Sequence, residues 1–435
     1  MHTTHLRNLD IVTLDQNSTI HVDAGLVIQD GRITHVGQAP ADPRADEVID
    51  ASGHVALPGL FNAHCHSPMT FERCWAEDLA FTKWLQTIWL VENELTPDDV
   101  YWGAQLASAE MIRTGTVGFN DMYFFMDRVA EVVRESGMKA ALSWAVFDAG
   151  QGSETSRSIG QTVDWIKTLQ KEQHPRIRTY LGPHSPYTCS QKTLGNFVEL
   201  AHELDQGIHL HLAEDQSQVD QSLERYGLRP VQHLDSIGAF DVPGGCVAGH
   251  TLVIDERDTE ILVEKEVYTP HCPITYLKLA MPFPSFKDRL EAGVRVPLGT
   301  DGPGSNSDMD MFAVIRQTAL IHKYQQVDPE MISGDMALRM ATQVGAAALG
   351  FADSGVIQVG APADLILVNK DTPHMRPIHN LVANLIHTAK GSDVTDVMVD
   401  GRWLMRKREL LTLDEERILY EAEAHAQALI KRADK

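Results

Sequence analysis

Between residues 59 and 360 the sequence repeats one pattern, in which a short apolar run ends in polar residues and a helix-compatible segment usually follows. Eight such runs occur, the first ending in "FNAHCH" and the others reading "TVGFNDMYF", "KAALSWAVFD", "RTYLGPHSPY", "GIHLHLAED", "GCVAGH", "VYTPHCP" and "VRVPLGTDG". Strands that alternate with helices form a parallel sheet, and eight units favour a closed barrel. We therefore predict an α/β fold with a (β/α)8 TIM-type barrel over residues 59–360.

The two ends of the chain differ from this repeat. Residues 1–58 alternate short β-type runs with turns such as Asp30-Gly31. β-type runs return in "APADLILVNKD" and "VTDVMVDGRWLMRKREL", before a charged terminal helix. We predict that residues 1–58 and 361–435 meet in one small β-sandwich beside the barrel.

The acidic balance of the chain limits its partners. It has 37 Lys and Arg against 60 Asp and Glu, a formal net charge of −23, and no basic cluster longer than "RKR" at residues 406–408. Nucleic acid and anionic membranes are poor partners for such a chain. The sequence has no apolar signal core and no run near the ~18 apolar residues of a spanning helix. We expect a cytoplasmic protein that acts on a small molecule.

Any metal ion would depend on histidines and carboxylates, because the five cysteines are an odd number without a CxxC pair. Active sites of such barrels lie at the carboxyl ends of the strands. The candidates that end the runs are His64, His66, His184, His209, His211, Glu214, His250, His271 and Asp301. A single histidine there is more often a hydrogen-bonded residue than a ligand, but six runs share the feature, which favours a catalytic site.

His64 and His66 stand at positions i and i+2, which places both imidazoles on one face of a strand. His211 lies nearer the carboxyl end of its run than His209 and is the favoured third ligand. Asp301 directly follows an apolar run and precedes a Gly-Pro-Gly turn that leaves its carboxylate exposed. Three imidazoles and one carboxylate suit Zn²⁺, and also Fe²⁺, better than Mg²⁺ or Ca²⁺. No lysine ends the middle runs, so one divalent metal ion is predicted.

Six segments carry a family resemblance: "LPGLFNAHCHSPMT", "LGPHSPYTCS", "HLHLAEDQSQVD", "VAGHTLVIDE", "HCPITYLKLA" and "LGTDGPGSNSDMDMF", with a closing "GAPADLILV". In this order they resemble the amidohydrolase superfamily, in particular the aminohydrolase branch that holds methylthioadenosine/S-adenosylhomocysteine deaminases, guanine deaminases and triazine hydrolases. The resemblance implies the same barrel and β-sandwich and one catalytic metal. It implies the ligands His64, His66, His211 and Asp301, with Glu214 as proton shuttle and His250 orienting the attacking water. Asp301 would accept the remaining proton.

The segments "HSPMTFERCWAEDLAFTKWLQ" and "NDMYFF" look closest to the methylthioadenosine/S-adenosylhomocysteine deaminases, which implies an adenosine-type substrate. By this resemblance His184 and Glu214 contact the substrate and Glu92 holds ribose hydroxyls. Trp144, which replaces an arginine that some members have, and Arg157 in the next loop are the further candidates for substrate binding.

Tyr276 replaces a small amide of the family pattern. Trp144 and Tyr276 are candidates to stack on a flat ring, with ordinary aromatic packing as the equal alternative. For Trp84 and Trp89, core or interface packing is favoured.

Two alternatives to this function stay open. The first is a deaminase or dechlorinase of another ring, namely pterin, guanine, cytosine or triazine. The second, a non-catalytic barrel used for assembly, is disfavoured because every expected ligand is present. The resemblance also implies a homo-oligomer, a dimer or a tetramer, and leaves open the choice between Zn²⁺ and Fe²⁺.

Overall fold

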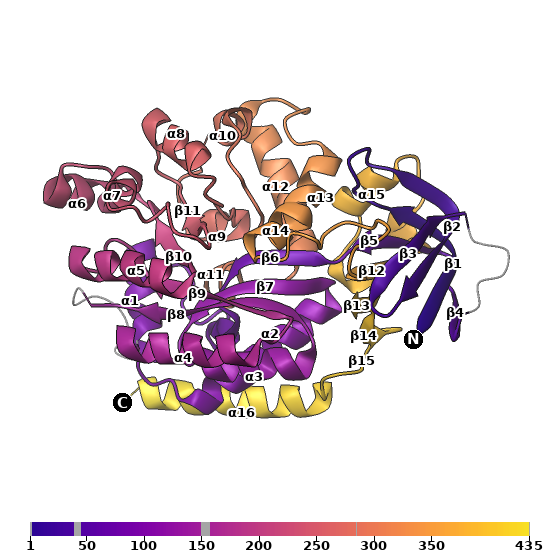
Figure 1. The fold of residues 1–435 in the computed structure, drawn as a ribbon, viewed down its shortest axis with the longest axis horizontal. Coiled ribbons are helices and arrows are strands. Elements are labelled where there is room, and N and C mark those ends of the chain that lie inside the picture. The colour runs from indigo at the N-terminus through magenta and orange to yellow at the C-terminus, as the bar shows by residue number, and fades with distance from the viewer. Residues whose placement is uncertain (1, 39–44, 149–156, 284, 435) are drawn as a thin grey trace.

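The computed structural model describes residues 2–38, 45–148, 157–283 and 285–434, which are organised by two sheets (Figure 1). The barrel sheet has six parallel strands that neighbour one another in sequence order. They are β6 Leu60–Cys65, β7 Thr116–Tyr123, β8 Lys139–Val146, β9 Ile177–Pro183, β10 Gly207–Leu212 and β11 Cys246–His250.

Two further segments, within residues 267–271 and 294–301, complete the barrel. Three isolated parallel bridges hold them: Val247 with Tyr268, Tyr268 with Arg295, and His271 with Leu298. The barrel closes where the Ala63 amide donates to the Leu298 carbonyl at 2.9 Å. These segments form bridges rather than long strands because Pro270 and Pro297 lack the N–H that a ladder needs. Eight segments thus surround the core, and the predicted barrel is confirmed.

Helices follow the strands, and most of them cover the outside of the barrel (Figure 1). In the first half of the barrel they are η1 Ser67–Glu72, α1 Phe81–Glu92, α2 Pro97–Arg113, α3 Met126–Ser136, α4 Ile159–Glu172 and α5 Gln191–Leu204. In the second half they are α6 Gln216–Tyr226, α7 Pro230–Ser236, α8 Glu256–Glu264, α9 Pro273–Lys278, α10 Phe286–Ala292, α11 Pro303–Asn306, α12 Met311–Gln326, α13 Gly334–Ala341 and α14 Gln343–Ala348. Local sequence fixes their starts: at α2, the Thr96 side chain and Asp99 form a capping box, and Pro97 takes the first helical position.

Strands from both ends of the chain form one nine-stranded sheet, in the order β15-β14-β13-β12-β5-β1-β2-β3 with β4 beside β1. Their bounds are β1 Thr3–Val12, β2 Ile20–Gln29, β3 Arg32–Gly37, β4 Glu47–Asp50, β5 His54–Pro58, β12 Leu365–Asn369, β13 Val394–Val399, β14 Arg402–Arg406 and β15 Glu409–Leu410. The expected hairpin lies between β2 and β3, where Asp30 and Gly31 both have positive φ angles, of 49° and 81°.

The two ends meet where β12 pairs antiparallel with β5, which confirms the predicted terminal β unit. The domain boundaries at residues 58 and 360 stay a prediction. Three elements follow β12 outside this sheet, η2 Pro373–Met375, α15 Leu381–His387 and η3 Gly391–Asp393. The terminal helix α16 Glu415–Ala433 returns along the barrel beside α2 (Figure 1).

Buried charges join the terminal sheet to the amino ends of the barrel strands. Lys139, at the start of β8, contacts the carboxylate of buried Asp364, and its Nζ lies 2.9 Å from Asp400 Oδ1 and 3.1 Å from Ser354 Oγ. Because the sheet occupies this end, the carboxyl ends of the strands point the other way, toward α5 and α6 (Figure 1).

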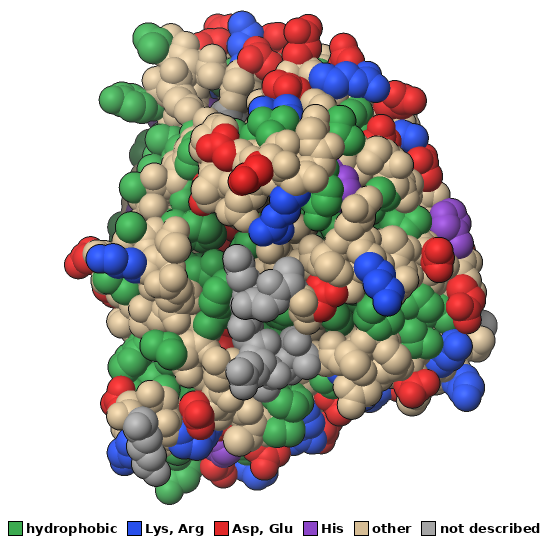
Figure 2. Space-filling model, turned by 90° about the vertical axis from the view of Figure 1, so that its left-hand side faces the viewer, with side chains coloured by type: hydrophobic (Ala, Val, Ile, Leu, Met, Phe, Trp, Pro, Cys, Tyr) green, Lys and Arg blue, Asp and Glu red, His purple; other side chains and the backbone are tan. Residues whose placement is uncertain are grey.

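Figure 2 shows the side of the molecule that lies away from the terminal sheet, where acidic, basic and apolar side chains are interspersed. Among the described residues, no helix is both long enough and apolar enough to cross a bilayer.

Candidate active site

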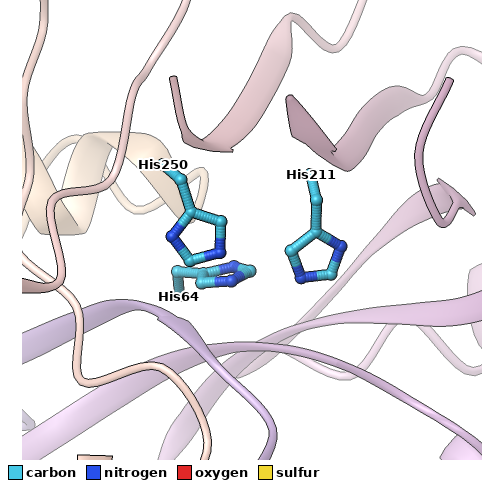
Figure 3. Close-up of side chains that lie close together, drawn as sticks. All are labelled: His64, His211 and His250. Atoms are coloured by element: carbon cyan, nitrogen blue, oxygen red, sulfur yellow. The ribbon is translucent and has the colours of Figure 1, made fainter. Parts of the chain in front are cut away.

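Histidines from three strands converge at the carboxyl end of the barrel. His64 lies on β6, His211 on β10 and His250 at the end of β11, and Figure 3 shows their rings facing one another. The His64 ring centroid lies 5.0 Å from those of His211 and of His250, with interplanar angles of 80° and 89°. Five strand-end side chains predicted from the sequence therefore form one cluster once His66 and Asp301 are added.

The potential ligand atoms of this cluster lie at metal-binding separations. His66 Nε2 is 3.2 Å from both Asp301 Oδ1 and His211 Nε2, and His64 Nε2 is 3.9 Å from Asp301 Oδ1. The ligand atoms of His64, His66 and Asp301 lie within 4.8 Å of one another, as do those of His64, His211 and His250. The structure thus brings the four predicted ligands together.

The other nitrogen of each ligand histidine is held by a neighbour. His66 Nδ1 lies 2.6 Å from the Met122 carbonyl, and His211 Nδ1 lies 3.0 Å from the His184 carbonyl. Because a carbonyl oxygen only accepts, each Nδ1 carries a proton. Nε2 then faces the centre of the cluster, either with a free lone pair or, when it is protonated as well, as a second donor.

The support for His64 is a side chain rather than a carbonyl. His64 Nδ1 lies 2.9 Å from His209 Nε2, and His209 Nδ1 lies 3.0 Å from Ser143 Oγ. His209 therefore supports a ligand without belonging to the cluster, and His211, which was favoured over it from the sequence, is the residue that reaches the cluster.

The electrostatics of the cluster fit a cation. Burial lowers the pKa of His64 and His211 well below the ordinary histidine value, so both imidazoles are neutral, as ligands must be. Among the described residues buried His64 Nε2 has no hydrogen-bond partner. Against the effect of burial, the hydrogen bond with His66 lowers the pKa of Asp301 to about 2, so this carboxylate is ionised. Against the effect of burial, the Asp301 carboxylate raises the pKa of His66 to about 9, so His66 would give up its Nε2 proton when a metal ion binds. Three imidazoles and an aspartate form a donor set that suits Zn²⁺ or Fe²⁺.

Two strand ends at the site have unusual backbone. His250 has a φ of 73° and Asp301 a φ of 64°, in the left-handed region that non-glycine residues rarely adopt. Such conformations concentrate at functional sites because the surrounding fold must hold them.

Glu214 and His250 stand beside the cluster as proton-transfer groups. Glu214 follows β10, is 5% exposed, and burial raises the pKa of its carboxyl to about 8. His250 Nδ1 lies 3.3 Å from the hydroxyl oxygen of Tyr276, a residue with no exposed surface. That oxygen also accepts a hydrogen bond of 2.9 Å from the Cys272 amide. Since an amide only donates, the Tyr276 proton is free to go to His250 Nδ1.

The cluster opens into a cavity at the barrel mouth, the kind of site where small molecules bind. Three of the predicted substrate contacts, Glu92, His184 and Glu214, line it together with His66, His211 and Asp301 of the metal cluster. His184 is stacked on Phe147 with ring centroids 4.2 Å apart, and burial lowers its pKa to about 3, so it is neutral.

The structure does not bring Trp144 and Arg157 to this cavity. Ala145 and Phe147 line it, so the alternation of side chains along β8 turns Trp144 to the opposite face, where it packs on Trp165 of α4 at 5.4 Å. The Arg157 guanidinium lies 3.8 Å above the Trp144 ring. Of the two readings of Trp144, aromatic packing is the one that the structure supports.

Tyr276 and His271 also lie outside the cavity lining. Tyr276 is buried against His250 rather than free to stack on a ligand. His271 pairs with His322, with 2.9 Å between the Nε2 atoms, apart from the metal cluster.

Sequence reasoning missed the aromatic wall of the cavity. Trp84 and Trp89, for which packing was favoured, both line it from α1. A signal was present, because Leu85, Trp89 and Glu92 have the helical spacing i, i+4 and i+7 and so share one face. Once Glu92 is assigned to the substrate side, its helical neighbours belong there as well.

A barrel with three imidazoles and an aspartate at its strand ends defines a metal-binding barrel enzyme. A model of the amidohydrolase family matches residues 55–404, most of the sequence. The chain belongs to the amidohydrolase family, as its ordered motifs predicted.

Individual relatives extend over nearly the whole chain. The 5-methylthioadenosine/S-adenosylhomocysteine deaminase of Dictyoglomus thermophilum is 46% identical over 402 residues, 92% of this chain and 93% of that one. The 5'-deoxyadenosine deaminase of Methanosarcina acetivorans is 38% identical and covers 99% of both chains. Among solved structures, an adenosine deaminase from Xanthomonas campestris with bound zinc has a TM-score of 0.92 at 32% identity and covers 98% of both chains.

Proposed function

We propose that the protein is a metal-dependent hydrolytic deaminase that releases ammonia from the adenine of a nucleoside such as 5'-methylthioadenosine or S-adenosylhomocysteine. The observation that carries this proposal is a buried carboxyl, Glu214, beside a histidine–aspartate cluster in a cavity at the barrel mouth. The names of the relatives above support it, since they are deaminases of adenine nucleosides.

One divalent metal ion, held by His64, His66, His211 and Asp301, is part of the proposal. When bound, it supplies hydroxide at neutral pH by lowering the pKa of a water molecule. Zn²⁺ is favoured over Fe²⁺ because the Xanthomonas campestris enzyme has bound zinc. The cytoplasmic location of the protein and its assembly into a homo-oligomer stay predictions from the sequence.

The residues around the cluster divide the proton transfers. Glu214 takes a proton from the attacking water and gives it to adenine N1, while the water oxygen bonds to C6. A pKa of about 8 suits this exchange, because a group near neutrality both accepts and releases a proton. His250 holds the attacking oxygen, and Asp301 accepts the remaining proton and passes it to the departing ammonia. Glu92 and His184 line the cavity as contacts for the rest of the nucleoside.

Tyr276 is expected to position His250. Burial lowers the pKa of His250 to about 4, so the ring is neutral, and a proton from Tyr276 at Nδ1 keeps the ring's own proton on Nε2. We expect Tyr276→Phe to lower kcat about tenfold with unchanged KM and unchanged metal content, as losses of such supporting hydrogen bonds do. Steady-state kinetics and metal analysis measure this. Tyr324→Phe, at an 82% exposed site, is the matched control, and a raised KM at normal kcat would argue for substrate contact instead.

A panel of amines tests the proposed function. Ammonia release is measured with 5'-methylthioadenosine, adenosine, S-adenosylhomocysteine, guanine, cytosine, a pterin and an aminotriazine. We expect release from at least one adenine nucleoside at a kcat/KM of ~10⁴ M⁻¹s⁻¹ or more, within the ordinary range for enzymes. Release only from guanine, cytosine, the pterin or the triazine would reject the adenine proposal in favour of that ring.

A further inference from the structure

One wall of the active-site cavity is apolar. Helix α1 and the segment after α9 supply it, with Phe81, Trp84, Leu85, Trp89, Leu279 and Met281. The same helix ends at Glu92, which lines the cavity together with His66 and Asp301 of the cluster. Glu92 therefore lies near the metal cluster, and the apolar residues extend from it along the helix.

The spacing along α1 places this wall beyond the ribose. With the adenine amino carbon at the metal cluster and ribose hydroxyls at Glu92, the next group of the ligand is the 5' substituent. Leu85 precedes Glu92 by seven residues, a rise of about 10 Å along a helix. The 5' substituent then meets Leu85, Trp89 and their apolar neighbours.

The described part of the cavity lining offers carboxyl and imidazole groups rather than the permanent cations of lysine and arginine. Among the described residues the lining includes Glu92, Glu214 and Asp301 but no lysine or arginine. Residues 149–156, outside the described part, read "AGQGSETS" and contain no lysine or arginine either.

Arg157 and Lys278, which stand near lining residues in the sequence, are engaged elsewhere, and Lys83, beside Trp84 on α1, is an exposed side chain outside the lining. Arg157 lies over the outer face of Trp144, with Asp127 and Asp164 as its acidic neighbours. Lys278, beside the lining residue Leu279, has its Nζ 2.7 Å from Glu77 Oε1 and 2.8 Å from Ser307 Oγ. In the described part of the lining a ligand carboxylate would find no lysine or arginine to pair with, and an unpaired buried ion is strongly disfavoured.

We propose that this cavity selects adenine nucleosides whose 5' substituent is uncharged and apolar, such as a methylthio or longer alkylthio group, and disfavours the zwitterionic homocysteine tail of S-adenosylhomocysteine. The inference rests on the proposed function, because it assumes that an adenine nucleoside is the substrate. It predicts different rates for 5'-methylthioadenosine and S-adenosylhomocysteine, which stand together in the name of the Dictyoglomus thermophilum relative.

Three nucleosides distinguish the effect of charge on the 5' substituent from the effect of its length. 5'-Methylthioadenosine carries a short apolar group, S-adenosylhomocysteine a charged four-carbon chain, and 5'-butylthioadenosine a chain of the same length without charges. We expect kcat/KM for the methylthio and butylthio compounds to agree within about tenfold, and the value for S-adenosylhomocysteine to be at least about 100-fold below that of the butylthio compound.

Each other outcome decides against the inference. S-adenosylhomocysteine used within tenfold of the butylthio compound would overturn selection by charge. A butylthio compound as poor as S-adenosylhomocysteine would show that length, rather than charge, limits the site. Deamination of none of the three would reject the proposed adenine nucleoside activity itself, and is thereby distinguished from a failure of selectivity.

A matched pair of variants on α1 tests the wall directly. Leu85→Arg places a cation in the cavity lining, and we expect it to raise the kcat/KM of S-adenosylhomocysteine relative to the butylthio compound about tenfold. Leu90→Arg makes the same change at a 64% exposed position of the same helix and is expected to leave the ratio unchanged. An equal ratio of the two kcat/KM values in both variants would contradict the placement of the 5' group at α1. If Leu85→Arg does not fold, the comparison of the three nucleosides with the unaltered enzyme still tests the inference.

Discussion

A His211→Ala variant is expected to lose its metal ion and to release ammonia at least about 10³-fold more slowly than the unaltered enzyme. His211 Nε2 lies 3.2 Å from His66 Nε2, and its Nδ1 is fixed by the His184 carbonyl, so the imidazole is oriented to the centre before any ion binds. Removing it takes one of four ligands and leaves a cavity where alanine offers no donor. Without the metal, hydroxide at neutral pH is too scarce to sustain the reaction.

Metal content and turnover are measured together for this variant. Elemental analysis after purification without chelator should find one ion per chain in the unaltered protein and much less than one in His211→Ala. His202→Ala, an exposed histidine of α5, is the control and should keep both metal and rate. Full metal content together with full activity in His211→Ala would remove this residue from the proposed ligand set.

The barrel was predictable because its pattern is local. Each strand is a short apolar run and each candidate ligand ends one, so the common edge of a parallel sheet brings them together. His64 and His66 needed only the two-residue period of a strand, and the structure places both at the cluster. The segments around Pro270 and Pro297 kept their places in the barrel although proline removes the ladder hydrogen bonds there.

The substrate wall was harder to predict because it depends on how elements pack. Trp144 was weighed as a substrate contact because it stands where some family members have an arginine and could stack on a flat ring. Ala145 and Phe147 define the inward face of that strand, and Trp144 lies on the opposite face. Trp89 resembles any half-buried helical tryptophan until α1 is known to lie over the barrel mouth. That placement is a long-range property that no local pattern contains.

The support of His250 by Tyr276 is of the same kind. The two residues are 26 positions apart and meet because β11 and the segment before α9 are neighbours in the barrel. The sequence identified Tyr276 as a departure from the family pattern, and only the fold shows that its hydroxyl faces His250 rather than the cavity.

A Glu214→Gln variant is expected to keep its metal ion and to lose about 10²- to 10⁴-fold in kcat, the range that general acid–base groups contribute. Glutamine has the same shape and fills the same buried site, but its amide cannot accept a proton from water and deliver it to adenine N1. Glu214 Oε1 has no hydrogen-bond partner among the described residues, so no protein contact is broken at that atom. Binding should therefore change little, and KM should stay within about threefold.

The measurements that separate chemistry from binding are kcat and KM with 5'-methylthioadenosine, and metal content in the same preparation. Loss of metal in Glu214→Gln would make this residue part of the metal site, and a near-normal kcat would end its assignment as the proton shuttle. Glu224→Gln, at an exposed position of α6, makes the same chemical change away from the cavity and should leave all three quantities unaltered. Because His211→Ala removes the metal and Glu214→Gln removes only the proton carrier, the pair assigns the two halves of the reaction to different residues.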